Sequence, residues 1–312
     1  MSFRILVTGG AGYLGSIMVP ELLLAGHEVT VVDNFMYGQN SLAQACINPK
    51  FNAIHGDVRI ESLMKPLIAK ADILIPLAAY VGAPLCARDP VGATTVNHDA
   101  IQMMLKHVSP NQFIVMPTTN SAYGSGEKDN FCTEESPLVP ISHYAIEKVK
   151  VEKMLMQHKN AISYRLATVF GMSPRMRIDL LVNDFTYRAV NDKFVVLFES
   201  SFKRNYIHIR DVTRAFLHAI ANMDRMRGQI FNVGLSDANV SKRELCEVIA
   251  KQVTGFTFID APIGKDPDQR NYIVSNEKIE RTGFKPIHSL EAGVAELIKG
   301  FAMIKNTRYG NV

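Results

Sequence analysis

A glycine-rich segment directly follows the first apolar run of the chain. The apolar run is RILVT at residues 4–8, and the glycines lie in GGAGYLG at residues 9–15. The run is predicted to form a buried strand, and the helix predicted after it includes Met18 and Leu22 and ends at Gly26. Glycine has no side chain, so the backbone can turn tightly and approach a pyrophosphate, whose charge then lies at the helix N-terminus. The segment therefore predicts a strand, loop and helix that bind a dinucleotide.

A carboxylate ends the next predicted strand. This strand covers residues 28–33, and its last residue, Asp33, lies 18 residues after Gly15, where a carboxylate can hold a ribose diol. Residues 34–40 contain no Arg or Lys, so the 2′-phosphate of NADP would meet repulsion without a counter-ion. The pattern predicts NAD as the cofactor. The alternative, that the glycines only shape a turn, is disfavoured because the other motifs of the chain agree with a dinucleotide site.

Strand and helix patterns alternate through the first half of the chain. Further strands are predicted at residues 51–55, 73–76, 113–116 and 163–166, with helical patterns between most of them, notably at residues 94–108. This alternation is typical of βαβ units, and it predicts an α/β fold with a Rossmann-type doubly wound parallel sheet.

The pattern becomes less regular after Gly171. We predict a helix at about residues 179–189, a strand pair at residues 194–197 and 206–209, a helix at residues 211–221, and helix and loop from residue 241 onward. Since no flexible linker separates the two parts, we expect a smaller α/β lobe that interleaves with the first. The expected division is residues 1–166 plus about 204–234 for the dinucleotide domain, and about 167–203 plus 235–312 for the substrate lobe.

Composition excludes several classes of protein. Of the 312 residues, 47% are hydrophobic, which excludes a disordered chain. The net charge of +4 is too weak a field to favour nucleic-acid binding, although it fits a small anionic ligand. The longest apolar stretch, residues 73–85, is interrupted by Pro76, Gly82 and Pro84 and is shorter than the roughly 20 residues of a membrane span. We therefore expect neither nucleic acid nor membrane as a partner.

The four cysteines are too far apart for a zinc or redox motif, so no metal site is predicted. They are Cys46, Cys86, Cys132 and Cys246. We expect reduced thiols that pack as small apolar side chains in a cytoplasmic protein, since the N-terminal residues show no export signal.

A tyrosine and a lysine stand four residues apart in YAIEK, at residues 144–148. On a helix this spacing places the phenol of Tyr144 and the ammonium of Lys148 on the same face. A free tyrosine loses its proton near pH 10, so the positive charges of Lys148 and of a nicotinamide ring would favour the phenolate at neutral pH. Tyr144 is therefore a candidate base that removes a proton from a sugar hydroxyl.

Several further segments join these motifs in a common pattern. They are VVDN at residues 31–34, GDV at 56–58, LAA at 77–79, Asn97, PTTNSAYG at 117–124 and RNYIHIRD at 204–211. With TGGAGYLG and YxxxK, the chain resembles the extended short-chain dehydrogenase/reductase family, the nucleotide-sugar epimerases and dehydratases, over most of its length. The resemblance implies an NAD-dependent enzyme whose substrate is a nucleotide-diphosphate sugar.

The resemblance assigns roles to individual residues. It implies catalytic roles for Thr119, Tyr144 and Lys148. It implies cofactor contacts from Gly9, Gly12, Tyr13, Leu14, Gly15, Asp33, Asn34, Asp57, Val58, Leu77, Ala78, Ala79, Asn97, Thr118, Tyr144 and Lys148. It implies substrate contacts from Val81, Gly82, Asn120, Ser121, Thr168, Arg175, Asn183, Arg204 and Arg270.

Three positions in two segments depart from the family pattern. Dehydratases of the family carry Thr-Asp-Glu where this chain has Thr119, Asn120 and Ser121. Because the acid and base that eliminate water are absent, dehydration is disfavoured. Thr168 stands where many members carry an Asn that touches the sugar nucleotide, so the substrate contact there is expected to differ.

The segment SPRMRIDLLVNDFTY, residues 173–187, narrows the resemblance to a branch that includes bacterial GDP-heptose C4 dehydrogenases of capsule biosynthesis. Arg175 and Arg177 are candidates to meet a nucleotide or pyrophosphate, or else to brace the helix near Asp179. We favour C4 oxidation without return of the hydride. A UDP- or GDP-sugar 4-epimerase and, more remotely, a non-catalytic NAD-binding module stay open, and the resemblance also implies a homodimer.

Overall fold

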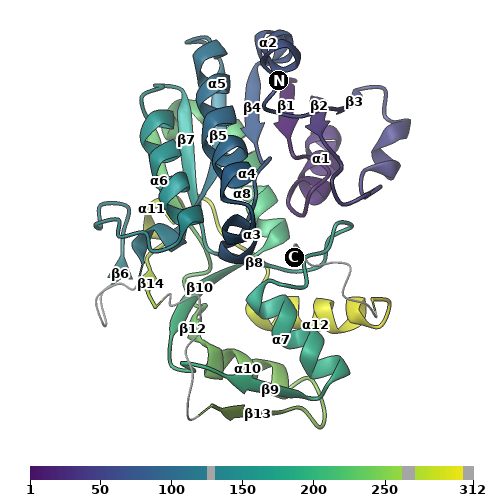
Figure 1. Cartoon of the computed structure of the whole chain (residues 1–312), viewed down its shortest axis with the longest axis vertical. Helices are drawn as coiled ribbons and strands as arrows, with labels where there is room; N and C mark the ends of the chain where they lie inside the picture. Colours follow the sequence, from purple (N-terminus) through teal and green to yellow (C-terminus); the bar gives the residue numbers. More distant parts are fainter. Residues whose placement is uncertain (125–130, 262–270, 305–312) are drawn as a thin grey trace.

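The computed structural model describes residues 1–124, 131–261 and 271–304 (Figure 1). Its main sheet has seven strands in the order β11-β7-β5-β4-β1-β2-β3, and every neighbouring pair is parallel. The predicted doubly wound parallel sheet is therefore confirmed. The strands are β1 (Arg4–Thr8), β2 (Glu28–Asp33), β3 (Phe51–His55), β4 (Ile73–Pro76), β5 (Phe113–Thr119), β7 (Ala161–Leu166) and β11 (Gln229–Val233).

Helices cover both faces of this sheet, which is why its central strands are apolar on both sides. Successive residues of a strand point to opposite faces. Ile5 and Val7 of β1 thus face one core, whereas Leu6 faces the other. The first core is covered by α1 (Gly15–Leu24) and α8 (Ile209–Ala221), and the second by α2 (Glu61–Lys70), α5 (Ala100–His107) and α6 (His143–Leu155).

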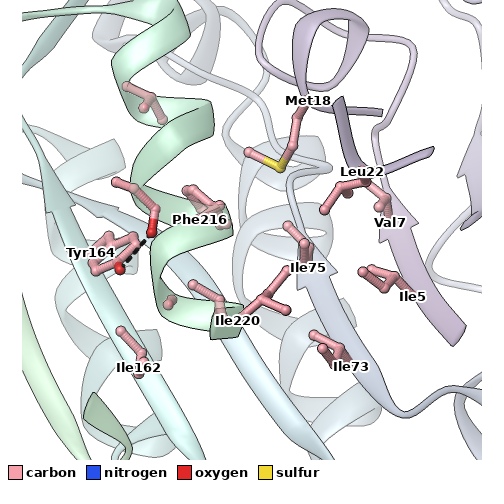
Figure 2. Packing of buried hydrophobic residues seen from close by; sticks show 14 of the residues in the cluster. Ile5, Val7, Met18, Leu22, Ile73, Ile75, Ile162, Tyr164, Phe216 and Ile220 are labelled. Atoms are coloured by element: carbon pink, nitrogen blue, oxygen red, sulfur yellow. Dashed lines mark hydrogen bonds between the residues drawn. The ribbon is translucent and has the colours of Figure 1, made fainter. Parts of the chain in front are cut away.

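Figure 2 shows the first core, where side chains of both covering helices meet the sheet. Met18 and Leu22 come from α1, and Phe216 comes from α8. The buried phenol of Tyr164 donates a hydrogen bond to the carbonyl of Ala215, with 2.9 Å between the oxygens. This bond joins β7 to α8 within the first core.

A smaller lobe lies below the main sheet in Figure 1 and has its own apolar core. It contains a three-stranded sheet, a two-stranded sheet and three packed helices. Its elements are β8 (Thr168–Phe170), β10 (Lys203–His208), β12 (Asn239–Ser241), β9 (Phe194–Leu197), β13 (Thr257–Asp260), α7 (Leu181–Asn191), α10 (Lys242–Ala250) and α12 (Leu290–Phe301). The exact division of the chain into two domains stays a prediction.

The remaining elements are short. They are η1 (Ala43–Ile47), α3 (Ala83–Arg88), α4 (Pro90–Thr94), the π-helical turn η2 (Thr95–Asp99), η3 (Asn120–Tyr123), β6 (Phe131–Cys132), α9 (Met223–Met226), β14 (Ile273–Val274) and α11 (Glu277–Glu280). The helix predicted at residues 94–108 is therefore interrupted: Thr94 ends α4, a π turn follows at Thr95–Asp99, and α5 continues from Ala100 to His107.

Two expectations for the second half of the chain were wrong. The strands predicted as a pair do not pair with each other, because β9 pairs in parallel with β13 while β10 lies between β8 and β12. The region after residue 241 is not only helix and loop, because it supplies β13 and β14. Both errors concern pairing between segments far apart in the chain, which local patterns do not report.

The cysteines mostly pack inside the chain. Among the described residues all four thiols are free, and three are buried while Cys46 is exposed.

The predicted homodimer stays a prediction. Met104 of α5 and Leu155 of α6 are buried within their own chain. Within the described ranges, no helix combines the length and apolar character needed to cross a membrane.

Candidate active site

A cavity of about 880 Å³ opens at the carboxyl ends of the main-sheet strands and is lined by residues of both lobes. Open α/β sheets bind ligands at this edge. Most of the predicted site residues line it. They are Gly9, Gly12, Tyr13, Leu14, Gly15, Asp33, Asn34, Asp57, Val58, Leu77, Ala78, Ala79, Val81, Gly82, Thr118, Thr119, Ser121, Tyr144, Lys148, Thr168, Arg175 and Arg204.

Three predicted residues lie behind the cavity wall, and each is buried. Asn97 exchanges two hydrogen bonds with the backbone of Tyr80, at 2.7 and 2.9 Å. Asn183 is bonded to the amide of Gly171, the carbonyl of Arg177 and the phenol of Tyr13. Within the described part of the chain, neither amide atom of Asn120 has a hydrogen-bond partner.

Arg270, the remaining predicted residue, lies outside the described residues.

The glycine loop is shaped by close backbone contacts. Gly9 has φ +67°, and a Cβ there would lie 2.6 Å from the backbone of Ala78. A Cβ at Gly15 would lie 2.4 Å from the carbonyl oxygen of Gly10, so this glycine allows α1 to pack onto the loop. Gly12 differs, because a Cβ there would meet only the carbonyl oxygen of Gly9, at 3.1 Å, among the described atoms. A methyl group at residue 12 therefore requires that carbonyl to shift by a few tenths of an ångström, a smaller change than Gly9 or Gly15 would need.

We expect Gly12→Ala to weaken NAD binding by at least about tenfold, or about 1.4 kcal/mol, because the methyl group would occupy the surface that a pyrophosphate approaches. Thermal unfolding should change little. The matched control is Gly9→Ala, which should lower the melting temperature, since its methyl group meets backbone and its φ is left-handed. Calorimetric titration with NAD and thermal melts measure the two effects. Unchanged NAD affinity in Gly12→Ala would contradict the assignment.

Asp33 at the end of β2 is held by two backbone amides. Its carboxylate accepts hydrogen bonds from Ala11 in the glycine loop at 2.9 Å and from Phe35 at 2.8 Å. Burial raises the pKa of this carboxyl above its usual value, although these two hydrogen bonds and the coulombic effect of His55 oppose the rise. Asp33 therefore links the loop to the strand end while it faces the cavity.

The three predicted catalytic side chains come from two neighbouring elements. Thr119 ends β5, and its hydroxyl donates to Ser121 Oγ at 3.0 Å and accepts from the Ser121 amide at 3.1 Å. Tyr144 and Lys148 lie one turn apart on α6, with Lys148 Nζ 6.0 Å from the centre of the Tyr144 ring. Ser142 caps this helix by accepting from the Ala145 amide at 3.2 Å.

Lys148 is buried, and its Nζ donates a hydrogen bond to the carbonyl of Pro117 at 3.4 Å. Burial lowers the pKa of this lysine to about 8. One turn further along α6, the Glu152 carboxylate accepts hydrogen bonds from the hydroxyl of Thr118, at 3.0 Å, and from Ser163, at 2.7 Å. Two successive turns of α6 are thus bonded to successive residues of β5, which sets Tyr144 relative to Thr119.

Cationic side chains of the smaller lobe line the cavity. Arg204 on β10 is buried there. Arg177 also lines it and forms an ion pair with Asp179, two residues before α7 begins. Arg175 stacks on the ring of Tyr37, with its Cζ 3.9 Å from the ring centre, and donates to the carbonyl of Met176.

Sequence reasoning missed several residues of the cavity wall. They are Met36, Tyr37, Gln39, Tyr80, Ser142, Asp179 and Asp184. Tyr37 and Tyr80 follow β2 and β4 by four residues each, so position after a strand is the signal that could have found them. Nothing local distinguishes Asp184, which reaches the cavity through the packing of α7.

The residues present fit NAD. The glycine loop presents backbone without side chains, and α1 has no acidic residue in its first turn. Leu14 at the helix N-terminus makes no side-chain cap to any described residue, so this end is suited to an anionic ligand. Asp33 lies on the same cavity and can accept from ribose hydroxyls.

Comparison with known proteins agrees with this geometry. A model described as the NAD dependent epimerase/dehydratase family matches residues 5–234. The UDP-glucose 4-epimerase of Lactobacillus helveticus is 28% identical, and the match covers 91% of this chain and 92% of that protein. The low-salt glycan biosynthesis protein Agl12 of Haloferax volcanii is 26% identical, and the match covers 93% of this chain and 96% of that protein.

Among solved structures, the UDP-glucose 4-epimerase of Thermus thermophilus in complex with NAD superposes with a TM-score of 0.82. It is 24% identical, and the match covers 96% of this chain and 99% of that chain. The fold is therefore shared over nearly the whole length of both proteins.

Proposed function

Because the chain belongs to the NAD dependent epimerase/dehydratase family, we propose that this NAD-dependent enzyme oxidises C4 of a nucleotide-diphosphate sugar. The substrate we favour is a GDP-heptose, and the process is the synthesis of a surface polysaccharide. The observation that carries the proposal is that Thr119, Tyr144 and Lys148 line the same cavity as the glycine loop.

The chain's own residues supply the proton chemistry. Tyr144 removes the proton of the C4 hydroxyl, and Thr119 holds that hydroxyl by a hydrogen bond. Lys148, which is positively charged below its pKa of about 8, stabilises the phenolate that results. NAD, when bound, supplies the acceptor for the hydride that leaves the carbon. Arg204 is placed to bind the diphosphate, a task that suits a guanidinium group.

Oxidation without loss of water is supported by the residues after Thr119. Asn120 and Ser121 replace the acidic pair expected of a dehydratase, and Asn120 is buried behind the cavity wall. Neither side chain can act as a carboxylic acid and base for elimination.

A 4-epimerase is the second candidate, supported by the likeness to the 4-epimerase of Lactobacillus helveticus. Both reactions share proton removal by Tyr144 and differ in the fate of the keto sugar. In a dehydrogenase the keto sugar leaves, whereas in an epimerase it turns within the cavity and is reduced on its other face.

Purified protein incubated with GDP-heptose and NAD tests the proposal. The dehydrogenase should accumulate NADH, detected by absorbance, together with a keto sugar found by mass spectrometry. Conversion to a stereoisomer of equal mass without net NADH would select the epimerase. If neither NADH nor a stereoisomer forms with any of a panel of UDP-, GDP- and dTDP-sugars, both the dehydrogenase and the epimerase proposals are overturned.

Lys148→Met should reduce kcat/KM at pH 7 by roughly 10² or more, because the phenol then loses the charge that favours its ionisation. The wild-type value should fall as pH rises through about 8, where Lys148 loses its proton. The variant should lack that fall and continue to rise toward pH 10 as the phenol ionises. A pH–rate profile measures both, with Lys153→Met, an exposed lysine on the same helix, as the matched control. A variant profile with the wild-type shape would exclude this role for Lys148.

A further inference from the structure

Tyr37 and Arg175 bring the two lobes into contact at the cavity wall. Tyr37 lies in the loop after β2, and Arg175 lies between β8 and α7. The guanidinium carbon of Arg175 is 3.9 Å from the centre of the Tyr37 ring, within the range of a cation–π contact. Arg175 is 5% exposed and Tyr37 is 39% exposed, so the cation is desolvated while the ring forms the outer side of the contact.

The loop that carries Tyr37 is organised by Asp33. The Asp33 carboxylate accepts from the amide of Phe35, which has φ +49°. The amide of Gly38 then donates to the Phe35 carbonyl at 2.8 Å, and the amide of Tyr37 donates to Gln39 Oε1 at 3.1 Å. Asp33, the residue predicted to bind the ribose, thus helps to order the loop that carries the Tyr37 ring.

The segment that carries Arg175, residues 171–177, is anchored on the glycine loop. The Tyr13 phenol donates to the Gly171 carbonyl at 2.7 Å. The Ser173 hydroxyl lies 2.7 Å from the Ser16 hydroxyl and donates to the Tyr13 carbonyl at 2.9 Å. These groups are buried, so the segment is held at the predicted pyrophosphate site before it reaches Tyr37.

We propose that the Tyr37–Arg175 contact is a latch that retains NAD in the enzyme. It joins a loop ordered by Asp33 to a segment anchored on the glycine loop. Release of a ligand held by both elements requires them to separate, and the latch resists that separation. The latch depends on the NAD dependence of the family and on no property of the sugar. A test of the latch can therefore fail or succeed independently of the proposed substrate.

The test is the rate at which NADH leaves the enzyme, measured by stopped-flow fluorescence without any sugar. Tyr37→Leu and Arg175→Met should each accelerate release about tenfold, the range of a desolvated cation–π pair. The double variant should release NADH no faster than the faster single variant, because the two residues form one contact. Tyr37→Phe keeps the ring face and should release NADH at nearly the wild-type rate.

Arg243→Met is the matched control, because Arg243 also lies over an aromatic ring, with its Cζ 5.8 Å from the centre of the Phe258 ring, but is not among the described residues that line the cavity. It should leave the release rate unchanged. The latch would be overturned if the effects of Tyr37→Leu and Arg175→Met were additive, or if Arg175→Met released NADH at the wild-type rate. In either case Tyr37 would act on NAD without Arg175. Arg175→Lys, which keeps the charge, guards against misfolding: it should release NADH more slowly than Arg175→Met, and equal rates in the two would also overturn the latch.

Discussion

Tyr144→Phe should bind NAD as the wild type does and should lose about 10²- to 10⁴-fold in turnover of the sugar nucleotide. The substitution removes only the phenolic oxygen, so α6 keeps its N-cap and its packing while the hydroxyl of the substrate loses its base. Steady-state kinetics and NAD titration on the same preparation measure the two quantities. The loss should appear in kcat more than in KM, because proton removal belongs to the transition state.

Tyr80→Phe is the matched control for this variant. Tyr80 lines the same cavity, but its backbone is held by Asn97 and its side chain is not on α6. We expect Tyr80→Phe to retain turnover within about tenfold, well short of the loss expected on removing the base. Unchanged turnover in Tyr144→Phe, or a greater loss in Tyr80→Phe, would move the role of base to another group.

Glu152→Ala should destabilise the protein by about 3–5 kcal/mol, because it leaves the charge of Arg165 buried without its carboxylate. Both residues are buried, and Arg165 Nη2 lies 2.7 Å from Glu152 Oε1. The carboxylate also accepts from the hydroxyls of Thr118 and Ser163, which lie 2.9 Å apart, so its removal leaves at least one of these two donors unsatisfied. Urea unfolding followed by circular dichroism measures the change in the free energy of unfolding.

The adjacent exposed residue supplies the control, since Lys153→Ala on the same helix should change the free energy of unfolding by no more than about 0.5 kcal/mol. A double variant, Glu152→Leu with Arg165→Met, should recover most of the loss because it removes both charges. If the double variant is as unstable as Glu152→Ala, the cost lies in packing rather than in the unpaired charge.

Local patterns were sufficient for the first four strands of the sheet. Residues 4–8, 28–33, 51–55 and 73–76 form β1 to β4 with the predicted bounds. Each is a short segment rich in residues that favour strands, and glycine or polar residues bound it. By contrast β11, which completes the main sheet at residues 229–233, was not predicted. Its sequence QIFNV carries two polar residues, and Asn232 is buried where the strand pairs with β7 and where Tyr123 and Ser275 bond to its side chain.

The candidate site divides in the same way. The glycine loop, Asp33 and the Tyr144–Lys148 pair could be found because each belongs to one strand end, turn or helix, where spacing along the chain determines spacing in space. Asn183 shows the limit of that reasoning. The family resemblance implies that Asn183 contacts the substrate. Within the described residues, its amide group is instead hydrogen-bonded to Gly171, Arg177 and Tyr13 of its own chain.

The sequence by itself therefore determined the dinucleotide fold and the cofactor class, and it predicted which residues carry the proton chemistry. Only the tertiary structure paired Tyr37 with Arg175 and Glu152 with Arg165, and only it placed Asn97 and Asn120 behind the cavity wall. The physical reason is that the partner and burial of a polar side chain depend on which distant segment packs against it. Periodicity within one element carries no information about that choice.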